Sequence, residues 1–296
     1  MILAAGLGTR LAPITQYLPK PLFPVLNTPN LFRIIHQLKT AGFKDIIINS
    51  FHLAHALTKA LKPFNIKVIR EKKLLGTGGG IRNAIPLFDK SQPLLVINGD
   101  VVTDLSLRLI FQIHAENQPI ASMVLHDCHP YNKVHVEGNR VTSIGECDDA
   151  PFAFTGISVL GPEFMKYLPA KTPSSLIKAF IKAIEDRKQI LPIFVNDMAD
   201  AYIWEDMGSI QGYLSAHEKL IKKEGKPLVV HESSILPSDF KCRDWACVGK
   251  RVFIGEGVTL KRCIIWDDCK VKKGTTLTNQ AVTPFGSLKA RISTLD

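Results

Sequence analysis

Short apolar runs alternate with helical stripes through the first hundred residues of the chain. Met1–Ala5 and Pro93–Ile97 are continuous apolar runs, which are typical of strands buried on both faces. Asn30–Ala41 carries apolar residues three and four positions apart, as expected of an amphipathic helix. Further strands are predicted at Lys44–Ser50 and Ile66–Arg70, and further helices at His52–Leu61 and at Gly76–Leu87, the last one starting in a Gly-rich turn. This alternation predicts an α/β fold, namely a Rossmann-like doubly wound sheet that is mixed but mainly parallel.

Beyond residue 120 the pattern changes, because strand-like runs follow one another up to residue 159 without helices between them. A helix is then predicted over Thr172–Lys188, with Thr172 as its N-cap and Pro173 at its first position. Its apolar residues recur on one face, so we expect it to pack on the sheet.

The last part of the predicted catalytic region is a strand followed by a helix. Tyr202–Gly208 is the strand and contains two acidic residues, and Ser209–Lys223 is the helix. Glu224–Pro227 is the predicted linker, because it is polar and contains Gly and Pro. The predicted domains are therefore residues 1–224 and 225–296.

The C-terminal part has an apolar period of six residues. The period runs through Val248, Ile254 and Leu260 and, after a slip of one residue, through Ile265, Val271 and Leu277. Such a period is typical of a parallel β-helix, in which each face of a coil buries one aliphatic residue. The stretch is long enough for two or three coils only. We expect it to pack on the catalytic domain or on a neighbouring subunit, which would make the protein a homo-oligomer.

Composition and charge narrow the class of protein. With 46% hydrophobic and 22% charged residues the chain is an ordinary globular one, and no apolar run approaches the roughly 18 residues that cross a bilayer. The formal net charge is +10, but the lysines and arginines are spread along the chain without a block of five or six. We therefore expect no membrane and no nucleic acid as partner, and a positive field that suits phosphorylated substrates.

The six cysteines contain no C-x-x-C pair, which favours a reducing, cytoplasmic compartment. Four of them lie in the C-terminal part, where a zinc site is one interpretation. Their spacings fit structural zinc motifs poorly and fit the six-residue period better, so we interpret them as small interior residues: Cys242, Cys247, Cys263 and Cys269.

The chemistry is concentrated at the N-terminus, where the first strand runs directly into the Gly-rich turn Gly6–Arg10. Glycines let backbone N–H groups approach an anion, and an arginine binds phosphate oxygens with two parallel hydrogen bonds. Lys20 lies between two prolines, which hold the segment extended and present the lysine stiffly. The P-loop spacing is absent, and the third glycine of the dinucleotide fingerprint is replaced by Leu11.

Taken as a whole, Leu3–Val25 resembles the signature of sugar-1-phosphate nucleotidylyltransferases, roughly L-A-A-G-x-G-T-R-L-x-P-x-T-x-x-x-P-K-P-L-x-P-V. The segment Leu75–Gly80 is similar to the family's L-G-T-x-G segment, which contacts base and ribose. The resemblance implies Arg10 and Lys20 as catalytic residues. It implies as nucleotide-binding residues Leu3, Ala4, Ala5, Gly6, Gly8, Thr9, Gly76, Thr77, Gly78, Asn98 and Gly99. The C-terminal part resembles the left-handed, hexapeptide-repeat β-helix that several family members carry.

Two aspartates are candidate metal ligands and catalytic residues. Asp100 follows a buried strand, and a carboxylate at the carboxyl end of a strand is well placed to hold Mg²⁺. Asp100 also matches the family's G-D pair, and Asp206 matches the second aspartate in its W-x-D-x-G-[ST] motif. Glu205 is adjacent to Asp206, but on a strand it would point to the opposite face. We expect Gly6–Arg10, Gly76–Gly80 and Asn98–Asp100 to meet at one edge of the sheet.

Sugar-phosphate binding is the part of the resemblance that departs from the family pattern. Gly156 lies in an F-T-G-I strand that in the family runs near the sugar, and Glu146 stands where many members have a Glu-Lys pair. Here Cys147 replaces that lysine, and Lys133 is the candidate replacement. Otherwise the acceptor is bound more weakly or is a different one.

These features predict an EC 2.7.7 type enzyme that transfers a nucleotidyl group from a nucleoside triphosphate to a sugar 1-phosphate with Mg²⁺. The nucleophile is already ionised at neutral pH, so no general base is expected. We expect GTP and mannose 1-phosphate or a related sugar. The alternatives are a uridylyltransferase for an amino-sugar or glucose 1-phosphate, and a non-catalytic relative that binds nucleotide-sugar and regulates a partner.

Overall fold

The computed structural model describes residues 1–145, 149–169, 173–198 and 201–290, and these form two compact units. Unit 1 comprises Met1–Gly6 and Ile34–Tyr202, and unit 2 comprises Leu7–Arg33 and Ile203–Asp296. A stretch near the N-terminus thus packs with the C-terminal part of the chain. The predicted boundary at residues 224 and 225 concerns a different division, into a catalytic region and a tail, and stays a prediction.

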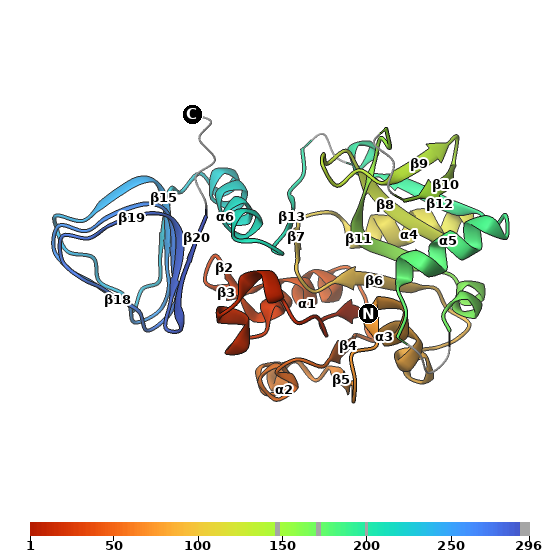
Figure 1. Ribbon diagram of the computed structural model, residues 1–296, viewed down its shortest axis with the longest axis horizontal. Coiled ribbons are helices and arrows are strands. Elements are labelled where there is room, and N and C mark those ends of the chain that lie inside the picture. Colours follow the sequence, from red (N-terminus) through yellow and green to blue (C-terminus); the bar gives the residue numbers. More distant parts are fainter. Residues whose placement is uncertain (146–148, 170–172, 199–200, 291–296) are drawn as a thin grey trace. The chain divides into compact units, whose positions relative to one another are not determined.

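Unit 1 is organised around a seven-stranded sheet (Figure 1). In spatial order its strands are β12 (Ile190–Phe194), β8 (Ala121–His126), β11 (Ala153–Leu160), β6 (Leu94–Asn98), β1 (Ile2–Leu3), β4 (Ile47–Ser50) and β5 (Lys67–Arg70). All neighbours pair in parallel except β11, which is antiparallel to both β6 and β8. The prediction of an α/β fold with a mixed, mainly parallel sheet is confirmed.

Helices cover both faces of this sheet, as the alternation along β8 shows. The hydroxyl of Ser122 is 2.8 Å from Nδ1 of His114 on α4 (Leu107–Asn117). Met123 points the other way, into the core cluster that contains Ile81 of α3 (Gly76–Ala84) and Phe180 of α5 (Leu176–Glu185). Since both faces are covered, the strand is buried at every position, including the polar Ser122 and His126. The unit also contains α2 (Ala54–Leu61), β7 (Val101–Thr103) and the antiparallel pair β9 (Val134–Glu137) and β10 (Arg140–Ile144).

The predicted start of the fifth helix is wrong. Thr172 lies outside the described residues, and α5 begins only at Leu176, where the hydroxyl of Ser175 accepts a hydrogen bond from the N–H of Ile177 at 3.2 Å. The reason is that Ser174 is used elsewhere, because its N–H donates to the carbonyl of Leu75 at 2.8 Å. The segment is therefore held extended before the helix begins.

The helix predicted over Gly76–Leu87 is present as α3, which continues as a 3-10 helix over Ile85–Leu87, and the glycines at its start form the first turns of the helix itself. Gly76 has φ +70°, and a Cβ there would lie 2.5 Å from the carbonyl oxygen of Ser174. A Cβ at Gly78 would lie 2.9 Å from the hydroxyl of the same serine. The glycines thus let the helix pack closely against the segment that precedes α5, and this packing outweighs their low helix propensity.

Unit 2 contains the proline-rich segment and the last helix. Three short 3-10 helices (Thr9–Leu11, Ile14–Gln16 and Lys20–Leu22) lead into the antiparallel pair β2 (Pro24–Val25) and β3 (Thr28–Pro29). These are followed by α1 (Asn30–Thr40), which continues into unit 1. Further along the chain, β13 (Trp204–Asp206) precedes α6 (Ile210–Glu224). The hydroxyl of Ser209 caps the start of this helix by accepting a hydrogen bond from the N–H of Gly212 at 3.1 Å, and Gly225 is its C-cap.

The remainder of unit 2 is a stack of parallel strands (Figure 1), which we call the tail, residues 225–290. Its strands are β14 (Leu228–Val230), β15 (Lys241–Val248), β16 (Phe253–Ile254), β17 (Thr259–Ile265), β18 (Lys270–Val271), β19 (Thr276–Thr283) and β20 (Gly286–Lys289). Aligned partners are mostly 17 residues apart, as in Ile254 with Val271 and Leu260 with Leu277. One coil thus contains 17 residues, one fewer than three complete six-residue repeats. The missing residue explains the slip of one residue in the six-residue period of the sequence. The stacking is parallel as predicted, and a left-handed hexapeptide-type β-helix stays a prediction.

The tail cysteines agree with their interpretation as interior residues in three of four cases. Cys247, Cys263 and Cys269 are buried, whereas Cys242 is half-exposed. Over the described parts of the chain, no three His, Cys, Asp or Glu side chains are grouped as metal ligands would be. None of the helices described is long and apolar enough to cross a membrane.

Candidate active site

In unit 2 three of the four predicted catalytic residues come together. The carboxylate of Asp206 lies 3.6 Å from the guanidinium of Arg10 and 3.7 Å from the ammonium group of Lys20. Arg10 is well exposed, at 63% of its side chain, whereas only 10% of the Lys20 side chain is exposed. Two cations share one carboxylate here, so the group has a net positive charge and can attract a phosphate.

The Gly-rich turn allows the segment that carries Lys20 to approach closely. Gly8 has φ +65°, and its carbonyl accepts a hydrogen bond from the hydroxyl of Thr15 at 3.1 Å. A Cβ at Gly8 would lie 2.8 Å from the Thr15 methyl group and 3.5 Å from Cβ of Lys20. Glycine is therefore required both by the backbone conformation and by the close approach of the lysine segment. The exposed Thr9 and Arg10 follow in the first short helix.

Asp206 and its neighbour Glu205 face opposite sides of β13, as the sequence predicts. Glu205 lies 2.7 Å from the ammonium group of Lys219 and accepts a hydrogen bond from the Ser215 hydroxyl at 2.6 Å, both on α6. Asp206 instead accepts from the N–H of Gly208 at 2.8 Å. A Cβ on Gly208 would overlap the guanidinium of Arg10, so this glycine makes room for the arginine.

In unit 1 the predicted nucleotide-binding residues lie where three neighbouring strands end. The N–H of Ala4, just after β1, donates to the side-chain oxygen of Asn49 at the end of β4 at 2.8 Å. The N–H of Gly99, just after β6, donates to the carbonyl of Leu3 at 2.8 Å. Asp100 follows and is half-buried. The prediction that the motifs meet at one edge of the sheet is confirmed for those that belong to unit 1.

A buried glutamate, Glu71, joins this edge to the start of α3. It is 3% exposed, and its carboxylate accepts hydrogen bonds from the Asn49 amide at 2.8 Å and from the N–H of Leu75 at 3.0 Å. A Cβ on Gly80 would lie 2.9 Å from one of its oxygens. Glu71 could not be found from the sequence, since a single acidic residue among basic ones is typical of a protein surface. A buried carboxylate needs such hydrogen bonds.

The L-G-T-G segment itself is partly accessible. Gly76 and Thr77 are exposed, whereas Gly78 is buried against the segment before α5. The Thr77 hydroxyl accepts a hydrogen bond from the N–H of Leu176 at 2.8 Å. A cavity of about 670 Å³ opens beside these two residues and is lined further by Tyr167 and Lys178. Binding of a base here stays a prediction.

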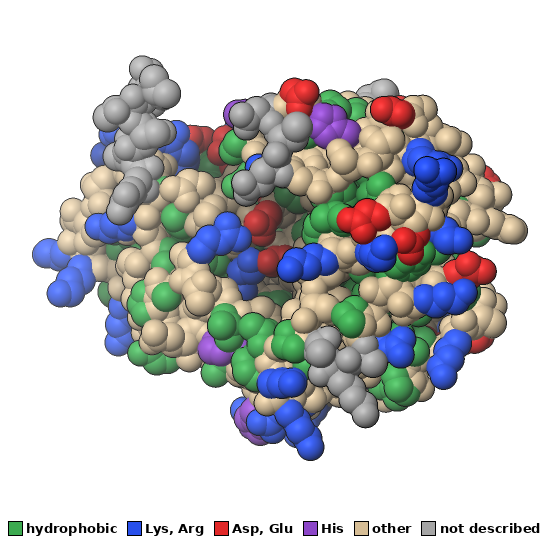
Figure 2. All heavy atoms as spheres, turned by 45° about the vertical axis from the view of Figure 1, so that its right-hand side comes forward, with side chains coloured by type: hydrophobic (Ala, Val, Ile, Leu, Met, Phe, Trp, Pro, Cys, Tyr) green, Lys and Arg blue, Asp and Glu red, His purple; other side chains and the backbone are tan. Residues whose placement is uncertain are grey.

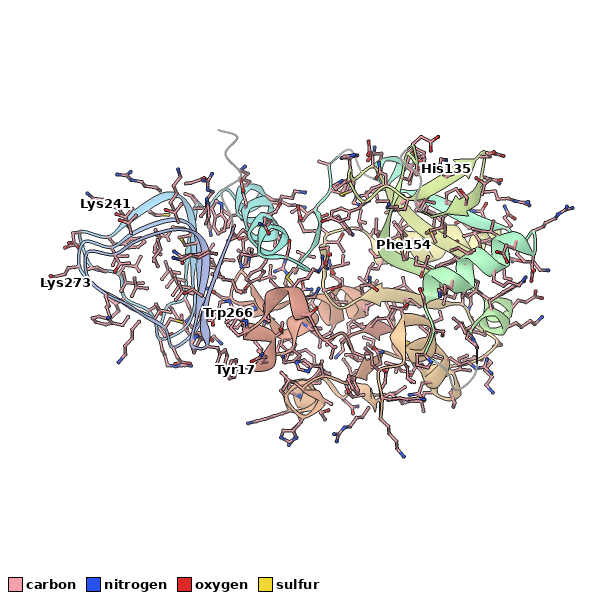
Figure 3. The ribbon with its side chains drawn as sticks, in the orientation of Figure 1. Tyr17, His135, Phe154, Lys241, Trp266 and Lys273 are labelled. Atoms are coloured by element: carbon pink, nitrogen blue, oxygen red, sulfur yellow. The ribbon has the colours of Figure 1, made fainter. Side chains whose placement is uncertain are left out.

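The predicted sugar residue Gly156 lies beside Asn98. Gly156 has φ +78°, and a Cβ would lie 2.6 Å from the Asn98 amide nitrogen. The pairing of β11 with β8 shifts by two residues between Phe154 (labelled in Figure 3) and Ser158, which is a bulge centred on this glycine. The bulge brings the middle of an antiparallel strand close to the residue that ends β6.

Of the remaining sugar-phosphate candidates, Lys133 alone lies within the described residues. Glu146 and Cys147 lie outside the described residues. Lys133 is exposed at the start of β9, where its backbone N–H donates to the carbonyl of Phe152 at 2.8 Å. Within the described chain, no ion pair or side-chain hydrogen bond links Lys133 to Asn98 or Gly156. Its role stays a prediction.

The donor chemistry is compatible with Mg²⁺. The described residues supply single carboxylates, Asp100 in unit 1 and Asp206 in unit 2, rather than a dedicated cage. Mg²⁺ usually takes one or two carboxylates and completes its octahedron with phosphate oxygens and water. On the face shown in Figure 2, lysine and arginine side chains are interspersed with acidic ones and form no single basic patch.

Comparisons with known proteins agree with this picture. Residues 1–223 match the family model described as "Nucleotidyl transferase". N-acetylmuramate alpha-1-phosphate uridylyltransferase of Neisseria meningitidis is 40% identical over 38% of this chain and 51% of that protein. Mannose-1-phosphate guanyltransferase of Yarrowia lipolytica is 27% identical over 77% of this chain and 67% of that protein. A crystal structure of UDP-glucose pyrophosphorylase with UDP-glucose has a similar fold, with a TM-score of 0.61 and 21% identity over 75% of this chain and 97% of that one.

Proposed function

This chain belongs to the nucleotidyl transferase family, and from that membership we propose that it transfers a nucleotidyl group from a nucleoside triphosphate to a sugar 1-phosphate. In this reaction an anionic oxygen of the sugar phosphate attacks the α-phosphorus. The bond from that phosphorus to the bridging oxygen breaks, and pyrophosphate leaves with the electron pair. Both of the relatives described above are named for reactions of this class.

The observation that carries the proposal is the grouping of Arg10 and Lys20 around Asp206 beside the Gly-rich turn. The attacking phosphate is already ionised, so catalysis consists of alignment and charge neutralisation. Arg10 and the backbone N–H groups of the turn bind the departing β- and γ-phosphates. Lys20, which is largely buried, neutralises charge at the reacting phosphates, where low exposure strengthens its effect.

Asp100 and Asp206 are the residues that would hold Mg²⁺. When bound, the ion would withdraw charge from the phosphates and fix their orientation. Asp206 has a second task that needs no metal, because it holds the side chains of Arg10 and Lys20 at a common position before substrate binds.

In unit 1 the ends of β1, β4 and β6 hold the base and ribose. Ala4 and Gly99 are fixed there by hydrogen bonds to neighbouring strands, and the start of α3 is fixed by Glu71. Gly156, which lies beside Asn98, faces the acceptor sugar, with Glu146 and Lys133 as further candidates.

For the substrates we propose GTP and mannose 1-phosphate or a related sugar, in keeping with the guanyltransferase relative that covers most of this chain. The second candidate is uridylyl transfer to an amino-sugar or glucose 1-phosphate, which the 40% identical segment of the uridylyltransferase relative favours.

The test is pyrophosphate release with Mg²⁺, with four nucleoside triphosphates each combined with a panel of sugar 1-phosphates. We expect turnover with GTP and mannose 1-phosphate and none in the matched Lys20→Ala variant. Turnover only with UTP would select the second candidate. No turnover with any pair, from a protein that still binds nucleotide, would contradict the proposed reaction.

A further inference from the structure

The lysine segment of unit 2 is anchored to the tail by three buried aromatic rings. Phe23 lies three positions after Lys20, and its N–H donates to the Lys20 carbonyl at 3.0 Å. The Phe23 ring packs edge-on against Trp266 of the tail, with 4.8 Å between ring centroids, and against Tyr213 of α6, at 5.8 Å. Phe23 and Tyr213 are fully buried, and Trp266 is 5% exposed (Figure 3).

A chain of hydrogen bonds runs through the same rings. The indole N–H of Trp266 donates to the hydroxyl of Tyr213 at 3.0 Å, and that hydroxyl donates to the carbonyl of Pro24 at 2.5 Å. Trp266 is itself fixed within the tail, because its backbone N–H donates to the carbonyl of Val282 at 2.9 Å. The backbone next to Phe23 is thus tied to the tail through directed bonds and not only through apolar packing.

Both partners of the Lys20–Asp206 ion pair depend on this cluster. Lys20 is connected to the cluster by the short segment that ends in Phe23. Asp206 is connected to it by α6, which begins four residues after Asp206 and contributes Tyr213. The tail makes a second attachment further along the segment, where the Asn27 amide donates to the carbonyl of Val248 at 2.9 Å. The tail therefore supports the two segments of unit 2 that carry Lys20 and Asp206.

We propose that Trp266 is a positioning residue for Lys20, so that the tail takes part in catalysis by holding the phosphate-binding charges in place. This inference rests on the proposed function, because it concerns the same phosphates. Trp266 touches neither substrate nor reacting atoms. It acts by fixing Phe23 and, through Tyr213, the carbonyl of Pro24.

The informative variant is Trp266→Phe in the full chain, which keeps an aromatic ring and removes the N–H donor. Its matched control is Ile254→Ala, which also damages the tail core, since Ile254 is 4% exposed and pairs with Val271 in the β16–β18 pair. Each protein is assayed for turnover, for the KM of nucleoside triphosphate and sugar 1-phosphate, and for binding of inorganic pyrophosphate by calorimetry with Mg²⁺. Thermal unfolding is recorded in parallel.

We expect Trp266→Phe to lower kcat and to weaken pyrophosphate binding by about tenfold, with the KM for sugar 1-phosphate within twofold of the wild type. Ile254→Ala should lower the Tm but leave kcat and pyrophosphate binding within twofold at a temperature where it is folded. Equal losses in both variants, or a lower Tm for Trp266→Phe with unchanged pyrophosphate binding, would overturn the inference and leave the tail a stabilising element only.

Pyrophosphate binding separates this result from the fate of the proposed function. A wild-type protein that binds pyrophosphate but turns over no sugar 1-phosphate contradicts the reaction, and the variants still decide the role of Trp266. A wild-type protein that does not bind pyrophosphate contradicts both.

Discussion

The two units carry their candidate residues by different physical means. In unit 2 they are charges, since Arg10, Lys20 and Asp206 lie 3.6–3.7 Å apart as ion pairs. In unit 1, apart from Asp100, they are hydrogen-bonding groups at the ends of strands, held by Asn49 and the buried Glu71. Coulombic attraction falls slowly with distance, whereas a hydrogen bond requires a narrow range of distance and angle. Unit 2 is suited to stabilising phosphates during reaction, and unit 1 to recognising shape and donor pattern.

The units also differ in what keeps these residues in place. In unit 1 the supports are the sheet and its two layers of helices, which leave the strand ends no freedom. In unit 2 the charged residues lie on short helices and turns, whose rigidity comes from a cluster of rings and the tail. Substitutions in the two units should therefore fail in different ways.

The largest effect is expected at Asp206 and not at the adjacent carboxylate of Glu205. Asp206→Asn should lower turnover by at least about a hundredfold, because it removes the common partner of Arg10 and Lys20. Glu205→Gln should change turnover by less than about threefold, since Glu205 faces Lys219 and Ser215 on α6. Initial rates of pyrophosphate release measure both. Equal losses in the two variants would show that β13 is needed for folding rather than Asp206 for chemistry.

Acid should also lower the stability of the protein. Burial lowers the pKa of His217 to about 4. Its hydrogen bonds suit the neutral ring, because Nε2 accepts from the N–H of Leu26 while Nδ1 donates to the carbonyl of Tyr213. The folded form thus holds the neutral ring, and the unfolded form takes up a proton below a pKa near 6.5. Stability is complete above that value and falls as the pH drops toward 4, by about 2 kcal/mol between pH 7 and pH 5.

Denaturant unfolding at both pH values tests this expectation. His217→Gln should flatten the dependence by that amount, and the exposed His55→Gln should leave it unchanged. In unit 1 burial also lowers the pKa of His114 to about 4, so acid should weaken both units. An unchanged pH dependence in His217→Gln would show that His217 is not held neutral.

A smaller effect is expected from the hydrogen-bond network of unit 1. Glu71→Gln places an amide nitrogen opposite either the Asn49 amide or the N–H of Leu75, so one of the two bonds is lost. We expect about a tenfold higher KM for the nucleoside triphosphate and a kcat within threefold. The exposed Glu163→Gln is the control. A lower kcat with an unchanged KM would show that Glu71 supports the chemical step rather than nucleotide binding.

The smallest effect belongs to a charge pair of unit 2 far along the tail. Arg251 and Asp268 lie 2.7 Å apart, but both side chains are well exposed. Arg251→Ala should shift the Tm by less than about 2 °C and leave turnover unchanged, because exposed pairs are screened by water and salt. A marked loss of activity would show that charge in this unit acts over a longer range than proposed.

Much of the fold could be predicted because it depends on local pattern. The apolar run before Asn98 and the stripe along Asn30–Thr40 each became the expected element. The start of α5 could not be predicted, because it is set by Ser174 bonding to Leu75, about a hundred positions earlier in the chain. The helix that begins at Gly76 was predicted, but the reason why its first turns contain so many glycines could not be, since it lies in that same packing.

The candidate site divides in the same way. Arg10, Lys20 and Asp206 are carried by long motifs and could be proposed from the sequence; the structure brings their side chains together, and their roles stay predictions. Glu71 was not found, because nothing in its local sequence distinguishes a buried carboxylate from an exposed one. The role of Trp266 likewise depends on contacts with Phe23 and Tyr213, which lie in distant parts of the sequence.

The last strand of the tail has a consequence for behaviour at high concentration. A stack of parallel strands ends in a row of open N–H and C=O groups, which invites another chain to add a strand. Here β20 turns back and pairs antiparallel with residues 280–283 of β19, so the same chain covers half of that strand's open edge. The edge of β20 itself is only four residues long and ends in Lys289, which disfavours further pairing. Addition of another chain is thereby hindered along that half of the last coil.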